Sequence, residues 1–224
     1  MKNFFPRLCP FLLVALTSFA LNVSGQEKAA TSPVAATATT APMSAPSQDE
    51  MMKQMAAMGA LNENHKLLGE LAGNWTYTVK FWMNGDPTSK PQESKGTATR
   101  KPVMGGRFYE LDVAGKMQMP GPDKKMKDFD FKGMSLEGYD NAKQKFTSNW
   151  VDNMGTGMLM SQGTYDAATK TFTYTGEVEM MAGMKTPIRE VIKVTDKDHH
   201  LLEWYENRGG NEVKTMEISY TRKK

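Results

Sequence analysis

Cysteine is almost absent from this chain of 224 residues: Cys9 is the single one, and it lies among the first 25 residues. An internal disulfide is therefore excluded, and so is a small fold held together by disulfides. Cys9 precedes Pro10 and the apolar run that follows, a position unsuited to a lipid-modified cysteine. We expect this cysteine to be removed with an N-terminal signal.

An excess of charge of one sign is also absent. The chain has 28 Lys and Arg against 25 Asp and Glu, and removal of Lys2 and Arg7 leaves 26 basic against 25 acidic residues. Basic and acidic side chains alternate along the chain, without a basic helix or stripe. This pattern argues against a nucleic-acid partner.

Long hydrophobic runs are missing as well. The apolar run at 11–21 has 11 residues, whereas a membrane-spanning helix needs roughly 20. It follows the basic residues Lys2 and Arg7 and precedes small residues at 23–25, the pattern of a cleaved signal peptide. We predict a signal peptide over 1–25, export to the periplasm or the medium, and no stable membrane span after cleavage. Retention of the segment as a membrane anchor is the alternative.

The composition then divides the rest of the chain. Residues 26–48 are rich in Ala, Thr, Pro and Ser and offer almost nothing for a core, which predicts a disordered linker. A short Met-rich helix is expected over 49–60, with Met51, Met55 and Met58 on one face, and a second over 62–71. Residues 61–224 suffice for one domain with its own core.

From Trp75 onward, helical spacing gives way to alternation. Trp75, Tyr77, Val79 and Phe81 share one face, as expected for a strand with one buried side. Similar segments recur with short turn-forming connections, and none of the connections is long enough for a crossover helix. The sequence predicts an all-β, antiparallel up-and-down barrel of about ten strands, in which Asp140 and Asp166 cap two hairpin turns. The further strands are expected near 95–103, 107–114, 129–138, 144–151, 156–165, 171–181, 187–195, 199–206 and 212–222.

Several spaced motifs carry a resemblance to a known family. Leu71-Ala72-Gly73-Asn74-Trp75, Met104-Gly105-Gly106-Arg107-Phe108, Gly138-Tyr139-Asp140, Lys145-Phe146, Trp150-Val151-Asp152 and the closing 216–222 occur in order. Over about 61–222 the chain resembles the bacterial DUF1579 family, whose name implies no activity. The opening Gly73-x-Trp75 and a basic residue in the last strand are also similar to lipocalin-like (calycin) barrels. That resemblance implies that Arg222 packs over Trp75 near a closed end, as a cation over an indole face.

No catalytic constellation is visible in the sequence. His65 is expected on an exposed helix, and His199 and His200 in a solvated turn, too few and too dispersed for a zinc site. No serine occupies a Gly-x-Ser-x-Gly elbow, and Arg208-Gly209-Gly210-Asn211 fits a hairpin turn without a following helix. We therefore predict a non-enzymatic protein without cofactor or resident metal.

Glu190 interrupts an apolar pattern. Ile188, Glu190, Ile192 and Val194 alternate onto one face. If that face points inward, burial raises the pKa of Glu190 unless a cation such as Arg107 or Arg222 pairs with it. Glu190 could anchor a ligand, form a structural ion pair or lie at the wet rim of the barrel.

The aromatic residues could line a cavity or fill a dry interior, and ten strands favour the cavity. The function predicted from the sequence is non-catalytic binding or carriage of a small apolar or amphipathic ligand inside the barrel. The predicted ligand-binding residues are Trp75, Tyr77, Phe81, Tyr109, Trp150, Tyr174, Glu190, Trp204 and Arg222.

Methionine supports an alternative, since the chain has 19 of them. Thioethers suit Cu(I), and the face carrying Met51, Met55 and Met58 is where three could converge. Most such methionines serve as flexible filler. Copper handling in the envelope, or an interaction module with a solid barrel, are the alternative functions.

Overall fold

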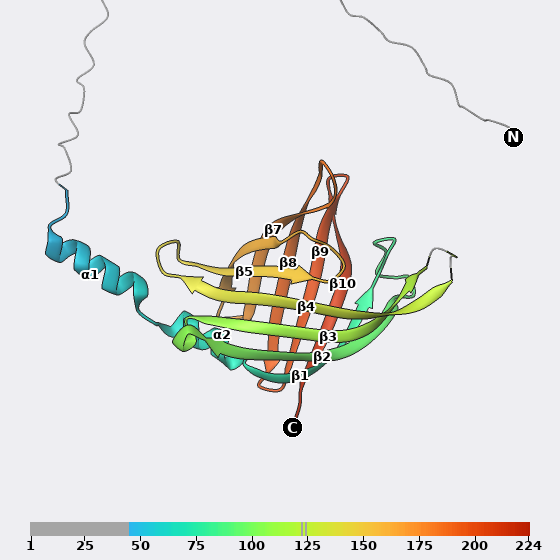
Figure 1. Ribbon diagram of the computed structural model, residues 1–224, viewed down its shortest axis with the longest axis horizontal. Helices are drawn as coiled ribbons and strands as arrows, with labels where there is room; N and C mark the ends of the chain where they lie inside the picture. Colours follow the sequence, from blue (N-terminus) through green and yellow to red (C-terminus); the bar gives the residue numbers. More distant parts are fainter. Residues whose placement is uncertain (1–44, 122, 124) are drawn as a thin grey trace, which may run out of the picture. The chain divides into compact units, whose positions relative to one another are not determined.

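The computed structural model describes residues 45–121, 123 and 125–224. The predicted signal peptide and most of the predicted linker lie outside the described residues. Ten antiparallel strands close into one barrel, preceded by two short helices (Figure 1). The elements are α1 (Gln48–Gly59), α2 (Glu63–Glu70), β1 (Gly73–Phe81), β2 (Gln92–Val103), the 3-10 turn η1 (Met104–Gly106), β3 (Phe108–Pro120), β4 (Met126–Asp140), β5 (Lys145–Asp152), β6 (Leu159–Asp166), β7 (Thr171–Met181), β8 (Met184–Asp196), β9 (His199–Arg208) and β10 (Asn211–Arg222).

Each strand pairs with the next one along the chain, and β1 closes the barrel by pairing with β10. In Figure 1, β1 to β4 run across the front of β7 to β10. The predicted all-β, up-and-down barrel of about ten strands is confirmed. Because side chains alternate along a strand, every second residue faces the enclosed space, which we call the lumen.

The two predicted turn caps are present. The Asp140 carboxylate accepts hydrogen bonds from the N–H groups of Ala142 (2.9 Å) and Lys143 (3.1 Å). Asp166 accepts one from the N–H of Ala168 at 2.9 Å. Each aspartate thus satisfies backbone donors that the tight turn leaves without a ladder partner.

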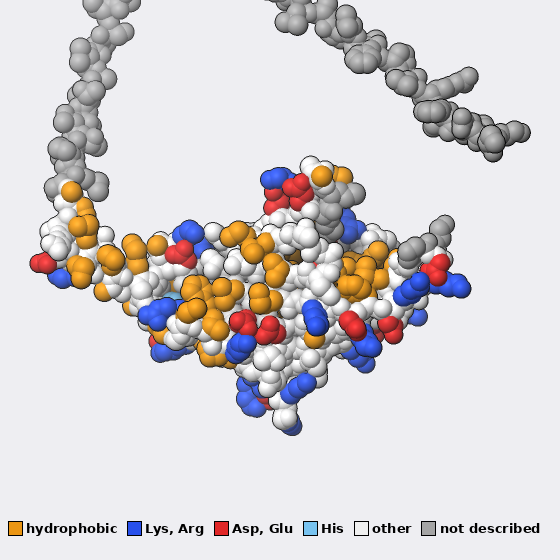
Figure 2. Space-filling model, viewed as in Figure 1, with side chains coloured by type: hydrophobic (Ala, Val, Ile, Leu, Met, Phe, Trp, Pro, Cys, Tyr) orange, Lys and Arg blue, Asp and Glu red, His pale blue; other side chains and the backbone are white. Residues whose placement is uncertain are grey.

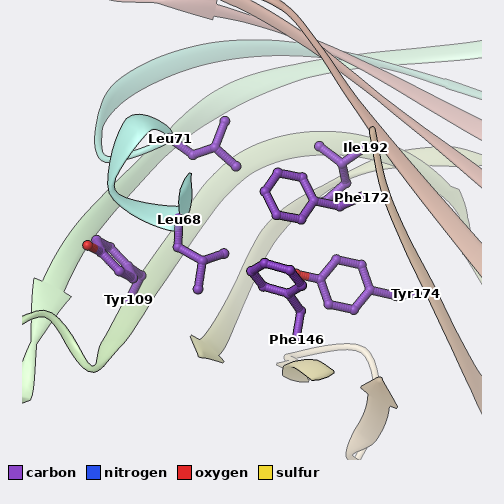
Figure 3. Close-up of a cluster of buried hydrophobic side chains, with 7 residues drawn as sticks. All are labelled: Leu68, Leu71, Tyr109, Phe146, Phe172, Tyr174 and Ile192. Carbon is purple, nitrogen blue, oxygen red and sulfur yellow. The ribbon is translucent and has the colours of Figure 1, made fainter. Parts of the chain in front are cut away.

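Helix α2 lies at one end of the barrel, which we call the helix end. Asn62 caps it by accepting the N–H of Asn64 at 3.0 Å. The helix inserts Leu68 and Leu71 among side chains from the barrel wall, and Figure 3 shows the two leucines facing the aromatic rings. This apolar cluster consists of Leu68, Leu71, Tyr109, Phe146, Phe172, Tyr174 and Ile192.

His65 on α2 is buried, so the prediction that it is exposed is wrong. Its Nδ1 accepts the N–H of Asn62 at 3.2 Å, which completes the cap. Its ring packs edge-on against Tyr139, with 5.8 Å between ring centroids. Burial, followed by the charge of Arg107, lowers the pKa of His65. These contacts make His65 a structural residue.

Arg222 joins three segments at the helix end. Its guanidinium lies 4.1 Å from the ring centroid of Trp75, the packing that the lipocalin-like resemblance implies. It donates hydrogen bonds to the carbonyl oxygens of Glu70 (2.8 Å), Ala72 (2.5 Å) and Lys197 (2.7 Å). The last strand therefore holds α2, the start of β1 and the β8–β9 turn together.

Helix α1 has no buried residue. Ser47 and Glu50 form a capping box at its start. At its end, the amide nitrogen of Asn141 donates to the carbonyl oxygens of Met58 (2.9 Å) and Ala60 (2.7 Å). The helix is thus tied to the β4–β5 turn while its methionine face stays exposed.

Candidate functional site

The nine predicted ligand-binding residues fall at three levels of the barrel. Trp75, Tyr109 and Arg222 lie at the helix end. Phe81 is the last residue of β1, toward the opposite end, which we call the far end. The other five occupy the middle of the lumen: Tyr77, Trp150, Tyr174, Glu190 and Trp204.

Three of the mid-lumen aromatic side chains lie flat along the wall, because inward-facing glycines make room for them. A Cβ atom at Gly96 would collide with the Tyr77 ring, and a Cβ atom at Gly133 with the Trp150 indole. A Cβ at such a position would displace the ring toward the lumen axis. The three pairs are Tyr77 with Gly96, Trp150 with Gly133 and Tyr174 with Gly163.

Glu190 sits between two aromatic residues. Its cross-strand neighbours are Tyr174 on β7 and Trp204 on β9. The pKa of Glu190 is raised to about 7, mainly by burial and also by the nearby Glu137 carboxylate, while Arg100 acts in the opposite direction. At neutral pH this carboxyl is therefore divided between its protonated and ionised forms.

A buried ion pair lies at the same level. Arg100 on β2 donates from Nη2 to Glu137 on β4 at 3.0 Å, and the two side chains are only 5% and 7% exposed. The Ser135 hydroxyl adds a hydrogen bond to the same Glu137 oxygen at 3.4 Å. The sequence analysis missed this pair. The alternation of Ala98 and Arg100 on one face of β2 was the signal that could have found it.

His200 also belongs to the interior, so the prediction of a solvated turn holds for exposed His199 but is wrong for His200. Its ring stacks on Tyr220 with 4.3 Å between centroids and an interplanar angle of 11°. It also meets Trp75 edge-on at 4.4 Å. Burial, helped by the charges of Arg100 and Arg222, lowers the pKa of His200 to about 3, so the ring is neutral at physiological pH.

Neither cation considered from the sequence pairs with Glu190. Arg107 lies exposed beside η1 and donates to the carbonyl oxygens of Met104 (3.4 Å) and Gly59 (3.2 Å). Arg222 is engaged at the helix end. The cation that acts on Glu190 is Arg100, which is already paired with Glu137.

The Glu190 carboxylate borders space that a water molecule can enter. In the described part of the chain, its oxygens accept no hydrogen bond. The fully buried side-chain atoms without a partner in that part are Arg100 Nη1 and His200 Nδ1, so the Glu190 oxygens, although largely buried, keep some surface that water can reach. Several inward-facing side chains around them are likewise only half-buried: Ser148, Trp150, Leu202, Trp204 and Ile218.

A hollow of about 510 Å³ lies on the outside of the barrel. Its walls come mainly from outward-facing residues of β2 to β4, such as Thr97, Asp112 and Lys132, together with Asn153 just after β5. Figure 2 shows hydrophobic side chains in separate groups among charged ones on the viewed face. This groove is open and lies on the other side of the barrel wall from Glu190.

Among residues 45–121, 123 and 125–224, no three His, Cys, Asp or Glu side chains converge as a metal site would require. In the same part of the chain, neither helix is long and apolar enough to span a bilayer.

The family described as "Protein of unknown function (DUF1579)" matches residues 60–222. The match covers α2 and all ten strands. No curated protein matches the chain. The family description names no ligand or reaction, so a function must be argued from the lumen.

Proposed function

The chain belongs to the DUF1579 family, and from that membership and the geometry of the barrel we propose an exported, non-catalytic protein that holds a small amphipathic ligand in the lumen. The observation that carries the proposal is the position of Glu190. Its unpartnered carboxylate borders water-sized space inside a wall of aromatic side chains. A polar group facing an apolar lining is the usual arrangement of a small-molecule site.

The glycine pairs add support. Tyr77, Trp150 and Tyr174 lie along the wall over glycines. The axis of the lumen is therefore less filled than it would be if these rings projected inward. At the helix end the lumen is sealed by apolar packing. A ligand would therefore place its apolar part among the aromatic rings and its polar group beside Glu190.

Export rests on the N-terminal residues alone. Two basic residues, an apolar run of 11 residues and small residues at 23–25 match a cleaved signal peptide. The absence of cysteine after residue 25 suits a protein that works in an oxidising compartment without needing disulfides.

The lumen is tested by filling it. Replacement of half-buried, inward-facing Ile218 with Trp should abolish uptake of N-phenyl-1-naphthylamine, a neutral apolar fluorescent probe, because the larger ring takes up the space. The matched control is Ser219→Trp, on the exposed face of the same strand, which should leave uptake unchanged. Circular dichroism checks that both variants fold. As an independent test, native mass spectrometry of the unmodified protein should show a co-purified lipophilic adduct. Absence of probe uptake and of adduct would refute the proposal.

Copper handling is a second candidate, favoured by one observation. Met51, Met55 and Met58 lie on one face of α1 and are 47%, 69% and 57% exposed. Thioethers that no neighbour covers are available to Cu(I). Titration of Cu(I) against a competing chelator should show binding that is lost when all three are changed to Leu. Equal affinity in this triple variant would dismiss the candidate.

A further inference from the structure

We infer that the ligand of the lumen carries a cationic, amine-type head group, which pairs with the Glu190 carboxylate. The inference rests on the proposed binding function and specifies the chemical class of the ligand. It follows from the charges at the middle level of the barrel and from the side chains that surround them.

The charge count comes first. Arg100 and Glu137 form a buried pair with 3.0 Å between Nη2 and Oε1, so their charges cancel. Glu190 adds a second carboxylate at that level, and the salt bridges of the described residues give it no partner within 4.0 Å. Ionised Glu190 therefore leaves one negative charge uncompensated. A monovalent cation would balance it, whereas an anionic head group would put three carboxylate-like charges around one arginine.

The charged group near the far end does not alter this count. Glu206 is buried there, and it pairs with Arg208 at 2.8 Å. Glu206 also accepts a hydrogen bond from the Thr215 hydroxyl at 3.0 Å. Its charge and its acceptor capacity are thus met within the protein, unlike those of Glu190.

The rings beside Glu190 suit a cation as well. Tyr174 and Trp204 are its cross-strand neighbours; Tyr174 is buried in the apolar cluster, whereas Trp204 is only half-buried and leaves part of its indole accessible. An ammonium group beside a desolvated indole or phenol gains a further attraction to the ring. A carboxylate ligand would gain nothing from these faces.

The arrangement makes binding depend on pH. An amine pairs only with ionised Glu190, and the pKa of this carboxyl is about 7. Amine affinity should therefore fall as the pH drops below about 7, approaching tenfold per pH unit, while an uncharged ligand keeps its affinity. The titratable, charged and aromatic groups that face Glu190 are Arg100 on β2, Glu137 on β4, Tyr174 on β7, Trp204 on β9 and Tyr220 on β10.

The test compares three ligands of one chain length that differ in head group: decylamine, decanol and decanoate. Each displaces N-phenyl-1-naphthylamine from the full chain at about pH 8. We expect decylamine to bind at least about tenfold more tightly than the other two, and Glu190→Gln to abolish this preference. Glu190→Asp, which keeps the charge, should retain the preference, and Glu177→Gln on the exposed face of β7 should not change it.

The outcomes separate the two proposals. Equal displacement by all three ligands, or an amine preference that persists in Glu190→Gln, would overturn the amine inference and leave the binding function standing. Failure of the probe and of every decyl ligand to bind would overturn the binding function and the inference with it. Both proposals would be supported if, in the unmodified protein, decylamine loses its advantage between about pH 8 and pH 5 while the affinity for decanol stays the same.

Discussion

Replacing Arg100 with Met is expected to destabilise the barrel by about 3–5 kcal/mol near neutral pH. The substitution leaves Glu137 buried without its cation, and removal of one partner of a buried ion pair costs far more than the pair contributes as a unit. Glu190 makes the loss more severe, since Arg100 is also the cation that opposes the repulsion between the two carboxylates. The free energy of unfolding, measured by urea denaturation at about pH 7.5, checks this prediction.

Two variants control for the loss of a long side chain. Lys101→Met removes the neighbouring cation, which is 53% exposed and pairs with Glu110 on the outer surface; because solvent screens this pair, the change should leave the free energy of unfolding nearly unaltered. Arg100→Met combined with Glu137→Leu removes both charges and should recover most of the lost stability. A loss below about 1 kcal/mol in Arg100→Met would show that Glu137 finds another partner or water in the folded barrel.

The ten strands could be predicted because their signals are local. Alternation of apolar and polar residues marks each strand, and turn-forming clusters separate them; the absence of long connections leaves an antiparallel meander as the expected order. Ends were harder to place: β3 continues to Pro120 and β4 begins at Met126, beyond the predicted 107–114 and 129–138. These extensions carry few buried residues, so hydrophobic alternation does not mark them.

The candidate site was only half predictable. Glu190 is a polar residue within an apolar run, which is visible in one strand. The Arg100–Glu137 pair joins β2 to β4 across the intervening β3, so it depends on how the closed barrel sets strand register. His200 lies an even number of positions from Leu202 and from Trp204, so all three face inward. The turn residues next to His200 led to the wrong prediction that it lies at the surface. Local pattern thus identifies which face a residue takes, while partners across the barrel follow from closure.

The acid stability of the fold should depend most strongly on His200. Its pKa is lowered from 6.5 to about 3 in the folded state, so below about pH 6.5 the unfolded chain binds a proton that the folded chain does not. Stability is therefore lost as the pH falls from about 6.5 toward 3, at up to about 1.4 kcal/mol per unit. Replacement with Phe keeps a ring against Tyr220 and Trp75 and cannot be protonated. We expect His200→Phe to change stability by less than about 1.5 kcal/mol at pH 7.5 and to be stabilised relative to the unmodified protein at pH 4, by about 3 kcal/mol.

Glu190 changes the free energy of unfolding with pH in the direction opposite to His200. Its pKa is raised from 4.5 to about 7 in the folded state, so between these values the folded chain holds the extra proton and stability falls as the pH rises. Urea denaturation from pH 4 to pH 8 should therefore show opposite changes in two variants. Over the range from about pH 7 down to 5, His200→Phe, which retains Glu190, should gain stability relative to its value at pH 7, whereas Glu190→Gln, which retains His200, should lose it. Parallel profiles in both variants would mean that the two groups do not titrate inside the barrel as their surroundings require, and the lumen would then be wetter than its packing indicates.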